Sequence, residues 1–177
     1  MALYKTGSQS EPSCLKIELF LSLLKKMTST DSSSIPQPAL ILGLAGLLPF
    51  FASAAFMWTG DAQLQQRAAL SLGAYGAVIL SFLGGVKWGI VLNGSTEHQW
   101  RELTLSVLPS IVAWMALLLP GAGTLLLLAA ALLGQYWLDF LSVRHGDLPR
   151  WFGKLRIVLT VGAVLSLVGG LVRLMTG

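Results

Sequence analysis

Long apolar segments separated by short polar ones dominate the chain from residue 39 onward. A helix needs about 20 mainly apolar residues to cross the hydrocarbon core of a membrane. Five segments meet or approach this length: 39–58, 68–92, 103–119, 123–141 and 155–175. They are continuous apolar runs rather than the short alternating strands of a β-barrel, and helices satisfy every backbone hydrogen bond internally, as lipid requires. The pattern predicts an all-α fold, an integral membrane bundle of five transmembrane helices.

The polar connections divide the chain into one large domain and an N-terminal segment. The connections between the apolar segments are short, so residues 39–177 are expected to form a single transmembrane domain. Residues 1–38 are polar or amphipathic, and we expect them to be disordered. Met27 opens the polar lead MTSTDSSSIPQP, so either Met1 or Met27 is the initiator. The intact mass of the natively expressed protein distinguishes the two.

Composition supports a membrane location. Hydrophobic residues make up 54% of the chain and charged residues only 11%, whereas soluble domains carry about 25% charged residues. A small soluble fold could not bury so much apolar surface, so we expect a lipid bilayer around the protein. The formal net charge is +4, but the basic residues form no continuous face, and we expect no nucleic-acid partner.

The distribution of lysine and arginine predicts an orientation, because cytoplasmic loops are enriched in these residues. With five spans, and leaving aside Lys87 within the second segment, the N-terminal side carries nine basic residues: Lys5, Lys16, Lys25, Lys26, Arg101, Arg144, Arg150, Lys154 and Arg156. The other side carries only Arg67 and Arg173. We expect a cytoplasmic N-terminus in a bacterial inner membrane, or a matrix-side N-terminus in the mitochondrial inner membrane of a eukaryote.

The second apolar segment contains a small residue at every fourth position. This ridge consists of Ala69, Gly73, Ala77, Ser81, Gly85 and Gly89. Small side chains at this spacing let a neighbouring helix approach closely. We expect the ridge to pack against other helices, with the second segment at the centre of the bundle. A substrate path lined by backbone is the alternative.

Two prolines, Pro49 and Pro109, lie inside the first and third apolar segments. Proline removes a backbone hydrogen bond and kinks a helix, so each predicts a bend. Such bends are either fixed or serve as hinges in transport.

Lys87 and Asp139 are ionisable residues well inside the predicted helices. Intramembrane charges are costly and are usually paired, or they extend toward the interface. Both lie at a similar depth near the N-terminal side, so they form an ion pair or reach the interface independently. Close by, Arg101, Arg144, Trp151 and Arg156 form either a site for an anionic lipid headgroup or a simple interfacial anchor.

The sequence contains none of the common catalytic motifs considered below. Walker A, HExxH and GxSxG patterns are absent, and Cys14 is the only cysteine. His98 and His145 lie in loops without a second ligand at metal-binding spacing. We therefore predict no catalytic residues, no cofactor and no metal site.

Four stretches together resemble a known family. These are LGLAGLLPFFA (42–52), ILSFLGGVKWGI (79–90), VLPSIVAW (107–114) and LPRWFGKLRIVLT (148–160), the last preceded by Asp139. They are similar to the bacterial domain-of-unknown-function 3429 family, which is related to the animal mitochondrial transmembrane protein 69. The resemblance implies a multi-pass inner-membrane protein and no established activity. It also singles out matching positions: Pro49, Gly84, Gly85, Trp88, Gly89, Pro109, Trp114, Asp139, Pro149, Trp151, Arg156 and Thr160.

These observations leave several function classes. We expect a non-enzymatic protein that binds or helps assemble a membrane-protein partner or a second copy of itself. A small transporter or channel is the alternative, and a lipid-modifying enzyme is a third. A polar path across the bundle would favour transport.

Overall fold

The computed structural model describes residues 35–59, 61–93, 99–145 and 148–176. The predicted N-terminal segment, with the choice between Met1 and Met27, lies outside the described residues except for residues 35–38. All regular structure in the described part is helical, which confirms the predicted all-α class. The helices are α2 (Gln37–Ala45), α3 (Leu48–Thr59), α4 (Ala62–Asn93), α5 (Gln99–Leu117), α6 (Gly121–His145) and α7 (Arg150–Thr176).

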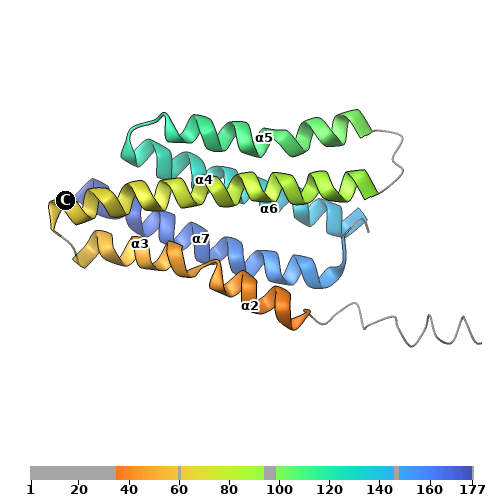
Figure 1. Ribbon diagram of the computed structural model, residues 1–177, viewed down its shortest axis with the longest axis horizontal. Helices are drawn as coiled ribbons and strands as arrows, with labels where there is room; N and C mark the ends of the chain where they lie inside the picture. The colour runs from red at the N-terminus through yellow and green to blue at the C-terminus, as the bar shows by residue number, and fades with distance from the viewer. Residues whose placement is uncertain (1–34, 60, 94–98, 146–147, 177) are drawn as a thin grey trace, which may run out of the picture. The chain divides into compact units, whose positions relative to one another are not determined.

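Most of these helices can cross a membrane. Within the described residues, four stretches are long and apolar enough by length and composition: Gln37–Thr59, Ala62–Leu92, Gly121–His145 and Arg150–Thr176. The first of them comprises α2 and α3 together. Helix α5, the predicted third span, is not among the four, and Arg101 and Glu102 lie in its first turn. It nevertheless packs along α4, so it extends beside a spanning helix (Figure 1).

Helix α4 is the axis of the bundle, as the small residues of its sequence predict. It contacts α3, α5, α6 and α7, while α6 and α7 also pack against each other (Figure 1). The helices run alongside one another (Figure 1). The largest fully buried side chains come from four of them: Phe50, Met57, Leu72, Leu80, Leu125, Leu128, Leu132 and Leu167.

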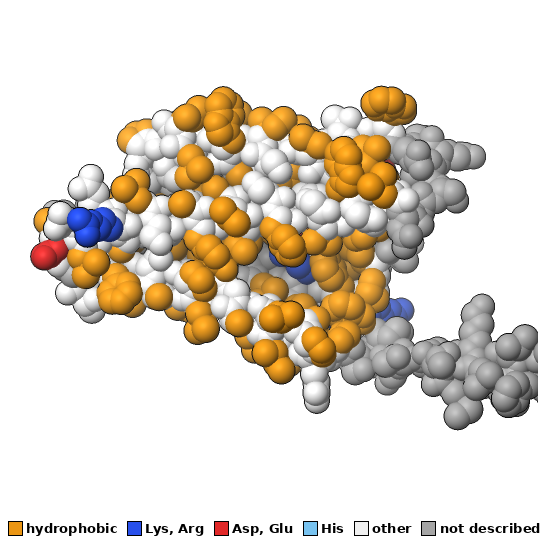
Figure 2. Space-filling model, in the orientation of Figure 1, with side chains coloured by type: hydrophobic (Ala, Val, Ile, Leu, Met, Phe, Trp, Pro, Cys, Tyr) orange, Lys and Arg blue, Asp and Glu red, His pale blue; other side chains and the backbone are white. Residues whose placement is uncertain are grey.

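Large apolar side chains also cover the outside of the bundle. Leu70, Leu126 and Leu165 have 59–69% of their surface exposed. Figure 2 shows one flank covered by such side chains, with charged ones at the ends of the helices and in a hollow near the middle. A soluble monomer rarely exposes continuous apolar surface of this extent. Lipid is therefore the solvent of this flank.

The helices begin where local chemistry supplies partners for the free backbone groups. Asp61 Oδ1 accepts a hydrogen bond of 2.8 Å from the Leu64 amide at the start of α4, as an N-cap residue does. Pro120 and Pro149 directly precede α6 and α7, where the lack of an amide proton costs nothing. Each of these residues favours the start of a helix at its position.

The first span is broken near Pro49. Helix α2 ends at Ala45 and α3 begins at Leu48, because the proline has no amide proton for the Ala45 carbonyl and its ring crowds that carbonyl. The break exposes the Gly46 carbonyl oxygen, which accepts a hydrogen bond of 2.8 Å from Tyr75 of α4. Pro109, in contrast, lies inside a continuous α5.

The predicted ridge of small residues needs a correction in its second half. Gly73 and Ala77 are buried, and a Cβ atom on Gly73 would lie 3.1 Å from Thr124 Cγ2. Gly85 and Gly89 are exposed, with nothing within 4 Å of a Cβ atom. The close approach occurs one residue earlier, at Gly84, where a Cβ atom would come within 3.0 Å of a backbone oxygen of α5.

The reason for this shift is geometric. Successive residues four apart turn through slightly more than one full turn of a 3.6-residue helix, so the row drifts around the helix axis. Over α4 the row leaves the contact with α6 and reaches the lipid-facing side. Ala69 and Ser81, at intermediate places on the row, are half-buried.

Candidate functional site

Four polar side chains are buried between α6 and α7. Gln135 and Asp139 lie one turn apart on α6, and Arg156 and Thr160 lie one turn apart on α7. Their exposed fractions are between 4% and 8%. Because burial of polar groups is costly without hydrogen bonds, the partners of these side chains determine what the cluster can do.

The centre of the cluster is an ion pair. Arg156 Nε donates a hydrogen bond of 2.7 Å to Asp139 Oδ2. Gln135 Nε2 donates one of 3.2 Å to the other carboxylate oxygen, Oδ1. Both carboxylate oxygens therefore have a partner. The pair carries no net charge, which makes its burial between two apolar helices tolerable.

Two polar atoms of the cluster have no partner. Arg156 Nη2 and Thr160 Oγ1 are buried and make no hydrogen bond within the described residues. The Thr160 hydroxyl is unlike several other helical hydroxyls of the chain, which bond to a carbonyl one turn earlier: those of Thr59, Thr104, Ser166 and Thr176. Two donors are thus left available on neighbouring turns of α7.

Both residues line a pocket on the flank of the bundle, here called the lateral pocket. Its volume is about 150 Å³. Apart from Arg156 and Thr160 its walls are apolar or glycine: Leu42, Gly43, Gly46, Leu47, Phe50, Ile79, Phe82, Leu83, Leu132, Leu159 and Ala163. Figure 2 shows a hollow on this flank with basic side-chain atoms at its bottom and hydrophobic side chains around it. The pocket opens toward the surroundings of the apolar flank.

The structure gives Lys87 and Asp139 different partners from those predicted. Lys87 Nζ lies 3.3 Å from Glu102 Oε2 at the start of α5, with 17% of the lysine side chain exposed. Asp139 binds Arg156 instead. The predicted ion pair between Lys87 and Asp139 is therefore wrong. Lys87 has its acidic partner on α5, and Asp139 has its basic partner on α7.

The predicted headgroup cluster is also divided by the structure. Arg101 and Arg144 are exposed, and the Arg144 guanidinium lies 5.6 Å from the centre of the Phe140 ring. Trp151 is half-buried and packs edge-on against Phe152. Arg156 differs from them because it is inside the bundle. It belongs to the buried cluster and not to an interfacial group.

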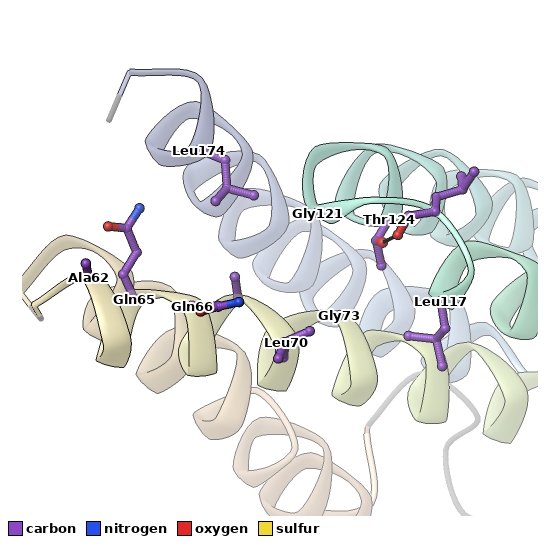
Figure 3. Close-up of a pocket in the computed structure, with 11 residues that line it drawn as sticks. Ala62, Gln65, Gln66, Leu70, Gly73, Leu117, Gly121, Thr124 and Leu174 are labelled. Atoms are coloured by element: carbon purple, nitrogen blue, oxygen red, sulfur yellow. Dashed lines mark hydrogen bonds between the residues drawn. The ribbon is translucent and has the colours of Figure 1, made fainter.

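A second pocket, here called the end pocket, lies where α4 and α6 begin and α7 ends. Figure 3 shows α4, α6 and α7 around it, with Gln65 and Gln66 on α4 and Thr124 on α6. Its volume is about 420 Å³. Two of its polar groups already have partners: Gln65 Oε1 accepts from Arg173 at 3.3 Å, and Thr124 Oγ1 donates to the Leu119 carbonyl at 2.8 Å. Gln66 is exposed. Among the described residues, the buried polar atoms without a partner belong to the lateral pocket's residues and not to those of the end pocket.

Sequence reasoning missed part of the cluster. Gln135 was not singled out, and Thr160 was named only through the family resemblance. Both stand one helical turn from a charged residue in a mainly apolar helix, Gln135 before Asp139 and Thr160 after Arg156. Polar residues at this spacing share one helix face, so the spacing could have indicated them.

The remaining expectations on chemistry concern loops. Within the described ranges no group of three metal-ligating side chains occurs. His98 lies outside these ranges. His145, at the end of α6, is exposed, and its Nδ1 lies 2.8 Å from the Leu141 carbonyl oxygen.

Comparisons with known proteins agree with the membrane fold. The family described as "Protein of unknown function (DUF3429)" matches residues 35–172. Transmembrane protein 69 of Xenopus tropicalis is 42% identical over 144 residues, covering 78% of this chain and 55% of that protein. Transmembrane protein 69 of Mus musculus is 36% identical over 152 residues, covering 81% and 59%. The chain thus spans somewhat more than half the length of these relatives. No solved structure matches it.

Proposed function

The chain belongs to the DUF3429 family, and we propose that it is a non-enzymatic membrane protein that binds a lipophilic ligand in its lateral pocket. The support is that two residues lining an apolar pocket, Arg156 and Thr160, each carry a buried polar atom (Nη2 and Oγ1) without a partner among the described residues. Leaving a buried donor unpaired costs about 1–3 kcal/mol. A bound molecule that supplies an acceptor would recover this free energy.

The make-up of the pocket supports binding rather than catalysis. Its polar lining consists of one arginine and one threonine. Arginine stays protonated in proteins and cannot act as a general base, and among the described residues no carboxylate, histidine or lysine lines the pocket to activate the threonine hydroxyl. A nucleophile needs such a neighbour.

The distance between the two pockets supports binding rather than transport. The lateral pocket and the end pocket share no lining residue. Along α4, the buried Gly76 and Ala77 come between the residues that line each of them. The bundle of a single chain thus has a packed apolar layer where a transporter of this size would need a polar path.

Native mass spectrometry of the protein extracted in mild detergent tests this proposal. We expect a fraction of the wild-type protein to carry an added mass in the range of a membrane lipophile. Leu159→Trp, which fills the lateral pocket from its wall, should lose the adduct. Leu165→Trp is the matched control, because Leu165 lies on the same helix with 63% of its surface exposed. Wild-type protein without any adduct, or adducts equal in all three proteins, would contradict the proposal.

The membrane and the orientation belong to the same proposal. We propose a bacterial inner membrane, or the mitochondrial inner membrane of a eukaryote, with the N-terminus on the cytoplasmic or matrix side. The excess of lysine and arginine in the loops of that side supports it. A reporter active only in the cytoplasm, fused after Gly177, should be inactive, and the same reporter placed after Asp147 should be active. The reverse result would invert the orientation.

A further inference from the structure

Resting on the proposed binding function, we infer that the lateral pocket recognises a neutral carbonyl oxygen carried by an otherwise apolar molecule. The ketone of a lipid-soluble quinone and the ester of an acyl lipid both present this group. The donors, the charge, the depth and the shape of the pocket each favour such a group.

The free polar atoms of the pocket require a hydrogen-bond acceptor. Arginine carries N–H donors and no acceptor, so the group facing Arg156 Nη2 has to accept. The Thr160 hydroxyl can donate to the same oxygen, since it lies one turn along α7 and has no other partner. A carbonyl oxygen has two lone pairs and can accept from both donors at once.

The charge of the surroundings favours a neutral acceptor over an anion. The positive charge of Arg156 is already matched by Asp139 at 2.7 Å, and Lys87 is matched by Glu102. An anionic group would therefore leave one uncompensated negative charge in the apolar interior, and such a charge is costly there. A carbonyl oxygen adds a partial charge only.

The depth of Arg156 and Thr160 along α7 also favours a neutral acceptor over a phosphate. Arg156 and Thr160 come six and ten residues after Arg150, the first residue of α7, which places them about 9 Å and about 15 Å along the helix. A phosphate headgroup stays at the interface in the region of Trp151, where aromatic residues gather. A neutral carbonyl group can enter the deeper level at a lower cost than a charged phosphate.

The size of the pocket suits a compact group with an attached tail. An apolar cavity of about 150 Å³ holds a benzene-sized molecule, and the lateral pocket has about this volume. Because it opens on the apolar flank, a tail can continue along Phe82 and Leu42, which have 64% and 73% of their surface exposed. The ligand therefore needs no water-filled route.

Binding to the full-length protein in dodecyl maltoside, a detergent without a carbonyl group, tests the inference. Four probes share one dodecyl tail: a dodecyl benzoquinone, methyl tridecanoate, dodecyl phosphate and dodecylbenzene. Apparent affinities come from the concentration dependence of the thermal unfolding temperature. We expect the quinone or the ester to bind at least about tenfold more tightly than the phosphate and the hydrocarbon, a ratio typical of one or two hydrogen bonds. The stronger of the two carbonyl probes identifies the source of the ligand.

One variant and its control test whether the Thr160 hydroxyl contacts the ligand. Thr160→Val removes a hydroxyl that has no partner in the fold, so the unfolding temperature of the free protein should not fall. The affinity for the carbonyl probes should drop about five- to tenfold, whereas the affinity for dodecylbenzene should not change. Ser166→Ala is the matched control, because Ser166 is buried on the same helix and bonds only to the Gly162 carbonyl.

The outcomes separate this inference from the proposed function. If dodecyl phosphate binds more tightly than the carbonyl probes, the ligand is anionic and the inference is wrong, while the binding function stands. Equal binding of dodecylbenzene, or unchanged affinity in Thr160→Val, also refutes the carbonyl contact. If none of the four probes binds, the binding function itself fails.

Discussion

Replacing Gly84 by alanine should destabilise the bundle, although the change adds only a methyl group. Gly84 lies where α4 meets α5, and a Cβ atom there would come closer than 3.0 Å to the backbone oxygen of Ser106. The obstacle is backbone and cannot rotate away. Since carbon and carbonyl oxygen normally approach no closer than about 3.3 Å, α4 and α5 would have to move apart locally.

The expected magnitude follows from two opposing effects. Overpacking that forces the backbone to shift costs about 1–3 kcal/mol. Alanine is a better helix former than glycine by up to about 1 kcal/mol, so part of the cost is offset. Gly85→Ala isolates the second effect, because nothing lies within 4 Å of a Cβ atom at Gly85. The two variants should therefore differ by about 1–3 kcal/mol.

Reversible unfolding of the purified protein in mixed micelles measures this difference in the free energy of unfolding. The mole fraction of sodium dodecyl sulfate is increased while the helicity of the protein is followed. Gly84→Ala should unfold at a lower fraction than Gly85→Ala, with a transition of equal steepness. Equal midpoints would refute the close approach of α4 and α5. A higher midpoint for Gly84→Ala would refute the packing geometry altogether.

Three further predictions concern the polar contacts inside the bundle. Tyr75→Phe removes the hydrogen bond to the carbonyl at the break of the first span and should cost about 1 kcal/mol in the same unfolding assay; an unchanged midpoint would contradict it. Asp139→Ala leaves the Arg156 charge buried without its partner and should cost about 3–5 kcal/mol, much of which Arg156→Met should recover in the double variant. Lys87→Met breaks only a partly exposed pair with Glu102, so it should cost under about 1 kcal/mol, and its effect should add to that of Asp139→Ala.

Most of the fold could be predicted because the membrane makes the sequence pattern simple. Every spanning helix has to be long, apolar and fully hydrogen-bonded, so the apolar runs show directly where α4, α6 and α7 lie. The match of residues 35–172 also confirms the family resemblance that the sequence motifs indicate. The break of the first span is harder to place, since Pro49 ends a helix one turn before its own position.

The pairing of the charges could not be predicted from depth alone. Lys87 and Asp139 lie at similar levels, but a pair also requires that two side chains face each other around the helix axes. Rotation about these axes is set by packing, and packing places Glu102 beside Lys87 and Arg156 beside Asp139. The assignment of Arg156 to the interface failed for the same reason, because its position near a loop does not reveal which way it points.

The position of the close helix contact shows a similar limit. Residues four apart do not stay on one face of α4, because their row drifts around the helix axis. The row therefore meets α6 at Gly73 and lipid at Gly89. The neighbouring Gly84 stands outside the repeat and was therefore not chosen from spacing. Finding it requires the direction of α5, which a single sequence does not contain.

The break between α2 and α3 divides the first span into parts of unequal local stability. Helix α3 buries Phe50, Ser53 and Met57, whereas α2 has no buried residue and contributes Leu42 and Gly43 to the wall of the lateral pocket. Segments with few buried contacts open at low free-energy cost, independently of global unfolding. The amide hydrogens of α2 should exchange with solvent deuterium well before those of α3. A molecule could then enter and leave the pocket from within the bilayer while the rest of the bundle stays folded.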